Sequence, residues 1–272
     1  MLKADLHVHS IVSDGSESME EIVRMAESKG LDAIAFTEHD TLAHLPRLPQ
    51  SASVWVMGGI EISAMDFDRR TRAHILGYNI QDINSVTAFT RPLLEARNRN
   101  SKKQVELLRR HGCAIDCDAL RRADGGYLYK QHIMEYLVET GQAQAMFGTF
   151  YQHVFKNNGI CDFDIRYLDV YQAVQTIAKA GGQAVLAHPG QQQNFYLIPL
   201  LAKRGLAGVE LDHPAHSPEE RLLIRSYAHT HRLFLTGGSD YHGQFEAQQS
   251  KVGDCLADES GVRAVCGIQH LV

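Results

Sequence analysis

The chain has 272 residues, of which 44% are hydrophobic and 22% are charged, so it can bury a sizeable core and is not intrinsically disordered. This length fits one large α/β domain, with or without a modest insertion. The formal net charge of −5 excludes a globally basic surface of the kind that binds nucleic acid nonspecifically, so any attraction for phosphate has to be local.

Cysteine usage and hydropathy bear on the compartment. The five cysteines are an odd number, and no two have the C-x-x-C spacing of a zinc knuckle or a redox site, so reduced structural thiols are expected. The first residues include charged side chains and histidines instead of an apolar signal core, and no stretch approaches about eighteen uninterrupted apolar residues. These features predict a cytoplasmic protein with no membrane span.

The first elements along the chain alternate strand, helix and strand. Residues 4–9 (ADLHVH) have the pattern of a strand, and so do residues 32–40 (DAIAFTEHD). Residues 18–30 between them have a helical pattern, with Ser18 as the N-cap and Glu21 completing a capping box.

The same alternation returns in the last third of the chain. Its predicted elements are a helix at 169–182, a strand at 183–190, a helix at 194–205, a strand at 207–214, a helix at 217–231 and a strand at 232–243. Alternation of this kind predicts a parallel sheet, which is either open or closed into a barrel.

The middle of the chain has a different pattern. Between about residues 87 and 166 the sequence is rich in helical patterns, such as 97–112 and 130–141, with little convincing strand. We therefore expect a helical insertion domain at 87–166, flanked by two parts of one α/β domain at 1–86 and 167–272.

Polar residues mark the ends of the predicted strands, and each of these strands is predicted to end in a histidine or an acid. Side chains two positions apart on a strand face the same way, so each such pair can bind one ion from the same side. Groups at the carboxyl ends of parallel strands converge on one cleft, and imidazole with carboxylate suits zinc, manganese or iron. The residues are His7, His9, His39, Glu61, His74, His188, Asp240 and His242.

Each of these residues taken alone has a simpler interpretation than a metal ligand. A lone histidine such as His74 is more often a core or surface residue than a ligand, and only the joint pattern favours a metal site. Asp5 shares the strand face of His7 but lies deeper, so we expect it to form a hydrogen bond behind the ligands. The GGSD stretch lacks the second glycine of a nucleophile elbow, so serine hydrolase chemistry has no support.

Eight stretches in this order resemble the motifs of the polymerase and histidinol phosphatase (PHP) superfamily of metal-dependent phosphoesterases, and most closely its TrpH-like branch. The resemblance implies an α/β fold, a distorted (β/α)7 TIM-like barrel with a small helical insertion domain. The stretches are DLHVHS, SDG, FTEHDT, GGIEIS, RAHILGY, AVLAHPG, ELDHPAHSPEE and LTGGSDYHG.

The resemblance also implies two to three divalent transition metals, which would be manganese, zinc or iron. The implied ligands fall into three sites. The first site would use His7, His9, Glu61 and Asp240, the second would share Glu61 and add His74 and His188, and the third would use Asp14, His39 and His242.

These features predict an enzyme that hydrolyses phosphate esters of nucleotides or phosphorylated sugars by metal-activated hydroxide attack on phosphorus. Three divalent ions against Asp14, Glu61 and Asp240 would leave a charge of about +3, which a phosphate dianion and a hydroxide would cancel. The expected partner is a small phosphorylated substrate (nucleotide, short oligonucleotide or sugar phosphate), with no membrane and no stable nucleic-acid complex.

Several alternatives stay open at this point. Within the same class, the chain could be a diesterase for a cyclic sugar or nucleotide phosphate, or a 5'-3' exoribonuclease that acts on short RNA. From other classes, it could be an amidohydrolase, although no lysine ligand stands at a predicted strand end. It could also be a noncatalytic metal-binding module, although all nine implied ligand positions are filled.

Substrate residues are less well defined than the ligands. Relatives often have Arg-Pro-His in the insertion where this chain has Lys130, Gln131 and His132, and Asp where it has Glu38, so a phosphate clamp is expected to be altered. We predict that Lys130, His132 and His216 bind substrate. We also predict His216 as a proton donor to the leaving oxygen, with helix capping or packing as its structural alternative.

Overall fold

The computed structural model describes residues 2–120, 126–245 and 250–266. The chain divides into two compact units, which we call the sheet unit (residues 1–90 and 167–272) and the helical unit (residues 91–166). Each unit has its own buried apolar core. That the helical unit is a separate insertion domain stays a prediction.

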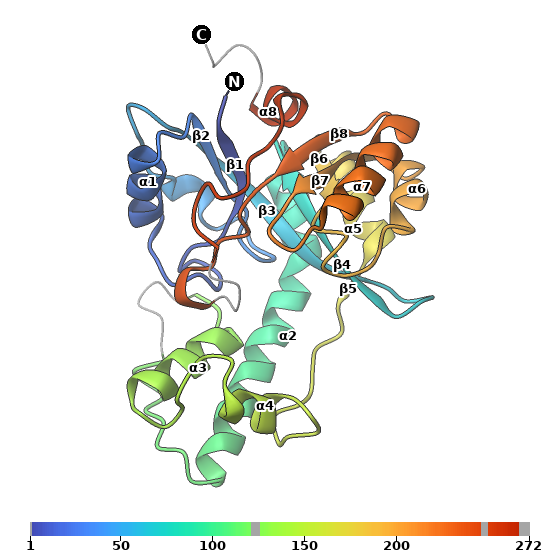
Figure 1. The fold of residues 1–272 in the computed structure, drawn as a ribbon. Helices are drawn as coiled ribbons and strands as arrows, with labels where there is room; N and C mark the ends of the chain where they lie inside the picture. Colours follow the sequence, from blue (N-terminus) through green and yellow to red (C-terminus); the bar gives the residue numbers. More distant parts are fainter. Residues whose placement is uncertain (1, 121–125, 246–249, 267–272) are drawn as a thin grey trace. The chain divides into compact units, whose positions relative to one another are not determined.

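The sheet unit is built on one curled sheet with helices around it (Figure 1). The strands pair in the order β1-β2-β3-β4-β6-β7-β8, and the short strand β5 pairs with β3. Val8 at the end of β1 bridges in parallel to Tyr241, which follows β8, so the two ends of the sheet meet at one point. The strands are β1 (Ala4–Val8), β2 (Ala33–Phe36), β3 (Trp55–Asp66), β4 (Thr71–Tyr78), β5 (Leu168–Asp169), β6 (Gln183–Leu186), β7 (Leu206–Asp212) and β8 (Phe234–Gly237).

Strand β4 is the exception to the predicted parallel sheet, because it runs antiparallel to both β3 and β6. A short turn joins β3 to β4, and Arg70 in that turn has a φ of 55°. A connection this short can only reverse the chain, whereas a parallel neighbour needs a long crossover. The α/β class predicted from the sequence is otherwise confirmed.

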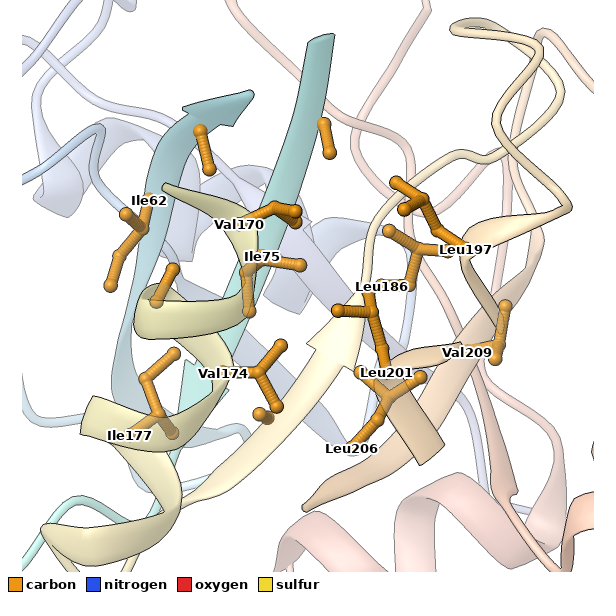
Figure 2. Close-up of a cluster of buried hydrophobic side chains, with 14 of the residues drawn as sticks. Ile62, Ile75, Val170, Val174, Ile177, Leu186, Leu197, Leu201, Leu206 and Val209 are labelled. Atoms are coloured by element: carbon orange, nitrogen blue, oxygen red, sulfur yellow. The ribbon is translucent and has the colours of Figure 1, made fainter. Parts of the chain in front are cut away.

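Helices cover the sheet, and their apolar faces build its largest core. Figure 2 shows Val170, Val174 and Ile177 of one helix beside Ile62 and Ile75 of β3 and β4. Spacings of three and four residues place the first three side chains on one face of that helix. The helices of the sheet unit are α1 (Met19–Ser28), α5 (Val170–Lys179), α6 (Leu197–Ala202), α7 (Pro218–His231) and α8 (Glu259–Cys266), with 3-10 turns η1 (Leu45–Arg47) and η2 (Gly243–Phe245).

Helix α1 begins as the sequence predicted. The Ser18 hydroxyl accepts a hydrogen bond from the Glu21 backbone N–H, and the Glu21 carboxylate accepts the Ser18 backbone N–H at 2.9 Å. Helix α7 begins with the same arrangement between Ser217 and Glu220. Each box satisfies backbone donors that a helix start otherwise leaves unpaired.

The helical unit contains most of α2 (Ile83–Arg110), with α3 (Lys130–Glu139) and α4 (Thr149–Phe155). The two helical patterns predicted for this region are confirmed, although α2 begins earlier than expected, within the sheet unit. The core of the helical unit includes Leu108, Ile133, Leu137 and Phe155. Among the residues described here, no helix is long and apolar enough to span a lipid bilayer.

Candidate metal centre

Most of the predicted ligands lie where strands of the sheet unit end. His7 is on β1 and His9 just follows it, His39 follows β2, His188 follows β6, and Asp240 follows β8. Asp14 lies in the loop after β1, and His242 lies two residues after Asp240. The structure brings all nine predicted ligands into one cluster of contacts, described below.

Glu61 and His74 correct the expectation that each strand ends at its ligand, because both lie inside long strands. The parallel pairing of β2 with β3 ends at Gly58, and Glu61 then bridges to His39. The pairing of β4 with β6 begins at Ile75, one residue after His74. Both ligands are therefore level with the carboxyl ends of the neighbouring strands, and the β3–β4 hairpin continues past that edge.

Glu61 is fully buried, and its two carboxylate oxygens face two sets of histidines. Its Oε1 is 2.7 Å from His74 Nδ1 and 3.0 Å from His188 Nε2. Its Oε2 is 3.1 Å from His9 Nε2 and 3.2 Å from His39 Nδ1. A carboxylate with one oxygen in each of two imidazole sets has the arrangement of a ligand that bridges two ions.

Four atoms form the best-defined candidate site. His7 Nε2 and His9 Nε2 are 3.3 and 3.1 Å from Glu61 Oε2 and 3.2 and 3.3 Å from Asp240 Oδ1. Ligand bonds of about 2.0–2.2 Å to one ion would separate the ligand atoms by roughly 3.0–3.5 Å. All four atoms are buried, and none has a hydrogen-bond partner within the described part of the chain. These residues therefore fit a divalent metal ion.

A second group surrounds Asp14. Its members His9, Asp14, His39 and His242 each offer an atom within 4.8 Å of the others. His242 Nε2 is 3.5 Å from Asp14 Oδ1, while His242 Nδ1 is 2.8 Å from the Asp240 carbonyl. That contact leaves Nε2 as the nitrogen that faces the group. The sequence had assigned only three of these residues to this site, and the structure adds His9.

The third group has two descriptions. Glu61, His74 and His39 each offer a ligand atom within 4.8 Å of the others, whereas the sequence had placed His188 with Glu61 and His74. His188 nevertheless shares Glu61 Oε1 with His74, and the two rings are 5.1 Å apart. Both histidines could therefore bind an ion held by that oxygen.

Burial and charge act in opposite directions on the groups around Glu61. Burial opposes ionisation of Glu61 and Asp240, but the surrounding histidines lower the pKa of each well below its usual value. Burial also opposes protonation of His9, yet Asp240 and Glu61 raise its pKa to about 10. The pKa of His7 is raised well above its usual value by Asp240, Glu210 and Glu61, against the effect of burial.

In the Asp14 group, the pKa values of two histidines are lowered instead of raised. Burial lowers the pKa of His39 to about 4, and the attraction of Asp14 and Glu61 does not compensate. The pKa of His242 is also lowered, first by burial and then by the charge of His9. The lowered pKa values favour the neutral imidazole at both residues, which is the form that binds metal.

Two residues behind the ligands were not identified from the sequence. Glu210 on β7 is fully buried, and its Oε1 is 3.0 Å from His7 Nδ1. His213 Nε2 is 3.2 Å from Asp240 Oδ2, on the carboxylate oxygen opposite the one that faces the ligand cluster. Both belong to the ELDHPAH stretch, in which only His216 had been selected. A buried acid within an apolar strand was the signal available for Glu210.

Two further acids hold the ligand loops in place. Glu38 accepts hydrogen bonds from the backbone and hydroxyl groups of both Ser10 and Ser13, so it ties down the loop between His9 and Asp14. This corrects the link drawn from the sequence between Glu38 and a phosphate clamp, because the carboxylate is buried and saturated by serines. Asp5 accepts hydrogen bonds from Ser239 and lies behind the ligands as expected.

The three predicted substrate residues have backbone or packing contacts. His216 Nδ1 is 2.9 Å from the Leu211 carbonyl, and its Nε2 accepts the Gly190 N–H at 3.1 Å, as its structural alternative requires. His132 Nδ1 accepts the Tyr129 N–H at 3.1 Å at the start of α3. Lys130 Nζ lies 5.7 Å from the centre of the Phe155 ring. Their roles toward substrate stay predictions.

Comparison with known proteins supports the same chemistry. The family model of the PHP domain matches residues 5–184. The chain is 42% identical over 248 residues to a phosphoribosyl 1,2-cyclic phosphate 1,2-diphosphodiesterase of Eggerthella lenta, covering 89% of this chain and 94% of the relative. It is 30% identical over 253 residues to the 5'-3' exoribonuclease Rnm of Salmonella typhimurium, covering 88% of this chain and 84% of the relative.

A solved structure agrees with the fold. A Bifidobacterium adolescentis protein assigned as a metal-dependent phosphoesterase superposes with a TM-score of 0.85 at 25% identity, over 97% of this chain and 95% of that one. The fold class implied by the sequence motifs is thereby confirmed. The cluster of buried histidines and carboxylates at the sheet edge fits divalent metal ions, as a metal-dependent phosphoesterase requires.

Proposed function

Since this chain belongs to the PHP domain family, we propose that it hydrolyses a cyclic phosphate diester of a phosphorylated sugar. It is a metal-dependent phosphoester hydrolase, as its relatives are. In the proposed reaction, water adds to phosphorus, one P–O bond of the cyclic ester breaks, and the released sugar oxygen takes up a proton. The product keeps its phosphate as a monoester. The relative that is 42% identical supports this choice of substrate.

The observation that carries the proposal is the buried Glu61 carboxylate, which divides its oxygens between two sets of histidines. We assign two to three divalent ions to the cluster, with manganese, zinc and iron as candidates. When bound, such ions supply a hydroxide nucleophile at neutral pH and positive charge against the phosphate. The assigned ligands are His7, His9, Asp14, His39, Glu61, His74, His188, Asp240 and His242.

The charges of the surrounding residues favour a diester over a monoester at the centre. Asp14, Glu61 and Asp240 face the candidate sites, and Glu210 is a fourth carboxylate whose pKa is lowered by His7 despite its burial. Three divalent ions would then leave a charge of about +2. A diester monoanion with a hydroxide balances that charge, whereas a phosphate dianion with a hydroxide exceeds it.

Selectivity for a second phosphate on the substrate is the role we propose for Lys130 and His132. Lysine supplies a point charge where relatives often have arginine, which suits a single phosphate oxygen better than a planar pair. His216 stays our candidate for protonating the leaving oxygen, although both of its nitrogens already contact backbone groups. Glu61 and Asp240 act on the reaction through the ions that they hold.

A panel of substrates tests the proposal. Manganese-loaded protein is given a ribose 1,2-cyclic phosphate that carries a 5-phosphate, a nucleoside 3',5'-bisphosphate, a short 5'-phosphorylated RNA and an amide. Hydrolysis of the cyclic ester with the highest kcat/KM supports the proposal. Preferred phosphate release from the bisphosphate, stepwise shortening of the RNA, or cleavage of the amide would each overturn it. A Glu61→Gln variant identifies activity from contaminants.

The exoribonuclease alternative has one specific observation in its favour, which is the 30% identity to Rnm. The RNA arm of the panel decides that question. An amidohydrolase is supported less well, because the relatives described above are named as a phosphodiesterase and an exoribonuclease. A noncatalytic module would show metal binding without turnover of any of the four substrates.

A further inference from the structure

Glu210 lies on β7 between two strands that lead to metal ligands, and its side chain is fully buried. Each of its carboxylate oxygens contacts a different ligand residue. We propose that Glu210 is a positioning residue that sets the orientation of His7 and His188 together, so that two histidines from different strands face the metal centre. The inference rests on the proposed metal centre.

The first contact fixes the ring of His7. Its Nδ1 is 3.0 Å from Glu210 Oε1. An ionised carboxylate has no proton to donate, so Nδ1 is the donor in this contact. When His7 loses a proton to bind metal, the remaining proton would therefore stay on Nδ1, and Nε2, 3.3 and 3.2 Å from Glu61 and Asp240, would present the lone pair. A carboxylate behind a ligating histidine commonly sets its tautomer and orientation in this way.

The second contact fixes the backbone of His188. Its N–H donates to Glu210 Oε2 at 2.8 Å, and the residue has a φ of 24°, which non-glycine residues rarely adopt. Such a conformation persists only where neighbouring groups hold it. With the backbone held there, His188 Nε2 lies 3.0 Å from Glu61 Oε1.

A carboxylate is required because both partners of Glu210 are donors. Glutamine has nearly the same shape, but its amide has one acceptor oxygen and one donor NH₂. In Glu210→Gln the NH₂ must face either the His188 N–H or the Nδ1–H of His7. The first arrangement loses the hold on His188, and the second moves the His7 proton to Nε2, where it blocks metal binding.

Metal affinity separates this role from a purely structural one. We expect Glu210→Gln to weaken binding of at least one equivalent of Zn²⁺ by about 10–100-fold in competition with a chromophoric chelator. Glu210→Asp keeps the charge but moves it away from its partners, so its Zn²⁺ affinity should lie between those of wild type and Glu210→Gln. Asp212→Asn is the matched control, because Asp212 is on the same strand and pairs with Arg221 at 2.8 Å, outside the ligand cluster. Its affinity should stay within twofold of wild type.

Unchanged affinity of Glu210→Gln for every equivalent would overturn the proposal. If Glu210→Gln does not fold, wild-type protein labelled with ¹⁵N-histidine and loaded with ¹¹³Cd decides it. The His7 ring should couple to the metal through Nε2 and carry a slowly exchanging proton on Nδ1, and coupling through Nδ1 would refute the inference. Absence of metal binding in wild type would instead refute the proposed function.

Discussion

The two units of the chain present their candidate functional residues in different ways. In the sheet unit, His7, His9, Glu61 and Asp240 are buried, and their inward atoms make no hydrogen bonds within the described structure. In the helical unit, His132 caps a helix and Lys130 lies over an aromatic ring. The candidate ligands thus gather their inward nitrogen and oxygen atoms in one buried cluster, whereas the candidate substrate residues make a backbone contact and a ring contact.

The largest expected effect sharpens this contrast within the sheet unit. Glu61→Ala should lower kcat/KM on the order of 10³-fold or more, because on the proposed ligand set this one side chain would hold two ions. Asp14→Ala should cost less, because Asp14 belongs to one group only. Turnover and metal content of both reconstituted variants measure the difference. Equal losses in two folded variants would contradict the bridging assignment.

Proton release on metal binding tests the two histidine environments. His9, with a pKa of about 10, and His7 hold protons at pH 7 in metal-free protein, and both must lose them to bind metal. Loading should release at least the His9 proton, and apparent affinity should rise by about tenfold per pH unit from pH 7 toward 10. Calorimetry in buffers of different ionisation enthalpy counts the protons. No net release would contradict the assigned ligands.

The stability of metal-free protein should change in the opposite direction. A raised folded-state pKa of His9 stabilises the fold fully below its ordinary value of 6.5, and that contribution is lost as pH rises toward 10. The melting temperature of metal-free protein should therefore fall over this range while metal affinity rises. Thermal scans with and without Zn²⁺ at matched pH values show whether the curves diverge.

A smaller effect is expected in the helical unit. Lys130→Ala and His132→Ala should each cost about 1.5–3 kcal/mol in kcat/KM for a substrate with two phosphates, with metal content unchanged. Discrimination between substrates with one and two phosphates should fall with it. Lys103→Ala is the matched control, because Lys103 Nζ also lies over an aromatic ring, 4.7 Å from the centre of Phe163. If Lys130→Ala and His132→Ala match the control in catalytic efficiency and selectivity, the two residues have only a structural role.

The smallest effect concerns stability alone. Ser18→Ala removes the N-cap of α1 and should lower the free energy of unfolding by about 1 kcal/mol. Metal content and turnover should not change, because Ser18 is not among the candidate ligands. Chemical denaturation of the loaded protein measures the loss. A large fall in activity at unchanged stability would show that α1 takes part in the site.

That the candidate ligands come together could largely be predicted from the sequence, because strand ends and two-residue spacing determine the direction of a side chain. His7 with His9 are read this way, and their ring nitrogens do meet at Glu61. Asp240 and His242 show the limit of the rule, because they lie beyond β8 and Asp240 has a φ of 51°. Strand alternation no longer applies there, and the two side chains enter different groups.

The remaining parts of the site depend on tertiary contacts that spacing does not encode. Glu210 and Asp212 are two positions apart on β7, and strand alternation gives both the same predicted direction. Yet Glu210 contacts His7, whereas Asp212 pairs with Arg221 on α7. Glu61 lies at the sheet edge only because the pairing of β2 with β3 stops at Gly58. The antiparallel direction of β4 depends on a turn that lacks the Asn-Gly or Asp-Gly pair of a typical hairpin. None of these could be read from one chain without its fold.

The meeting of the two sheet ends has a consequence for the order of events during protein synthesis. Asp5 holds Ser239, 234 positions later in the chain, next to the proposed ligand Asp240. At about 5–20 residues per second, the ribosome makes the second of these residues roughly ten to fifty seconds after the first. On the proposed ligand set, His7, His9 and Glu61 are made early, and through this interval they lack Asp240, the fourth residue of their group. The four-residue group can therefore be completed only late in synthesis, after Asp240 has been made.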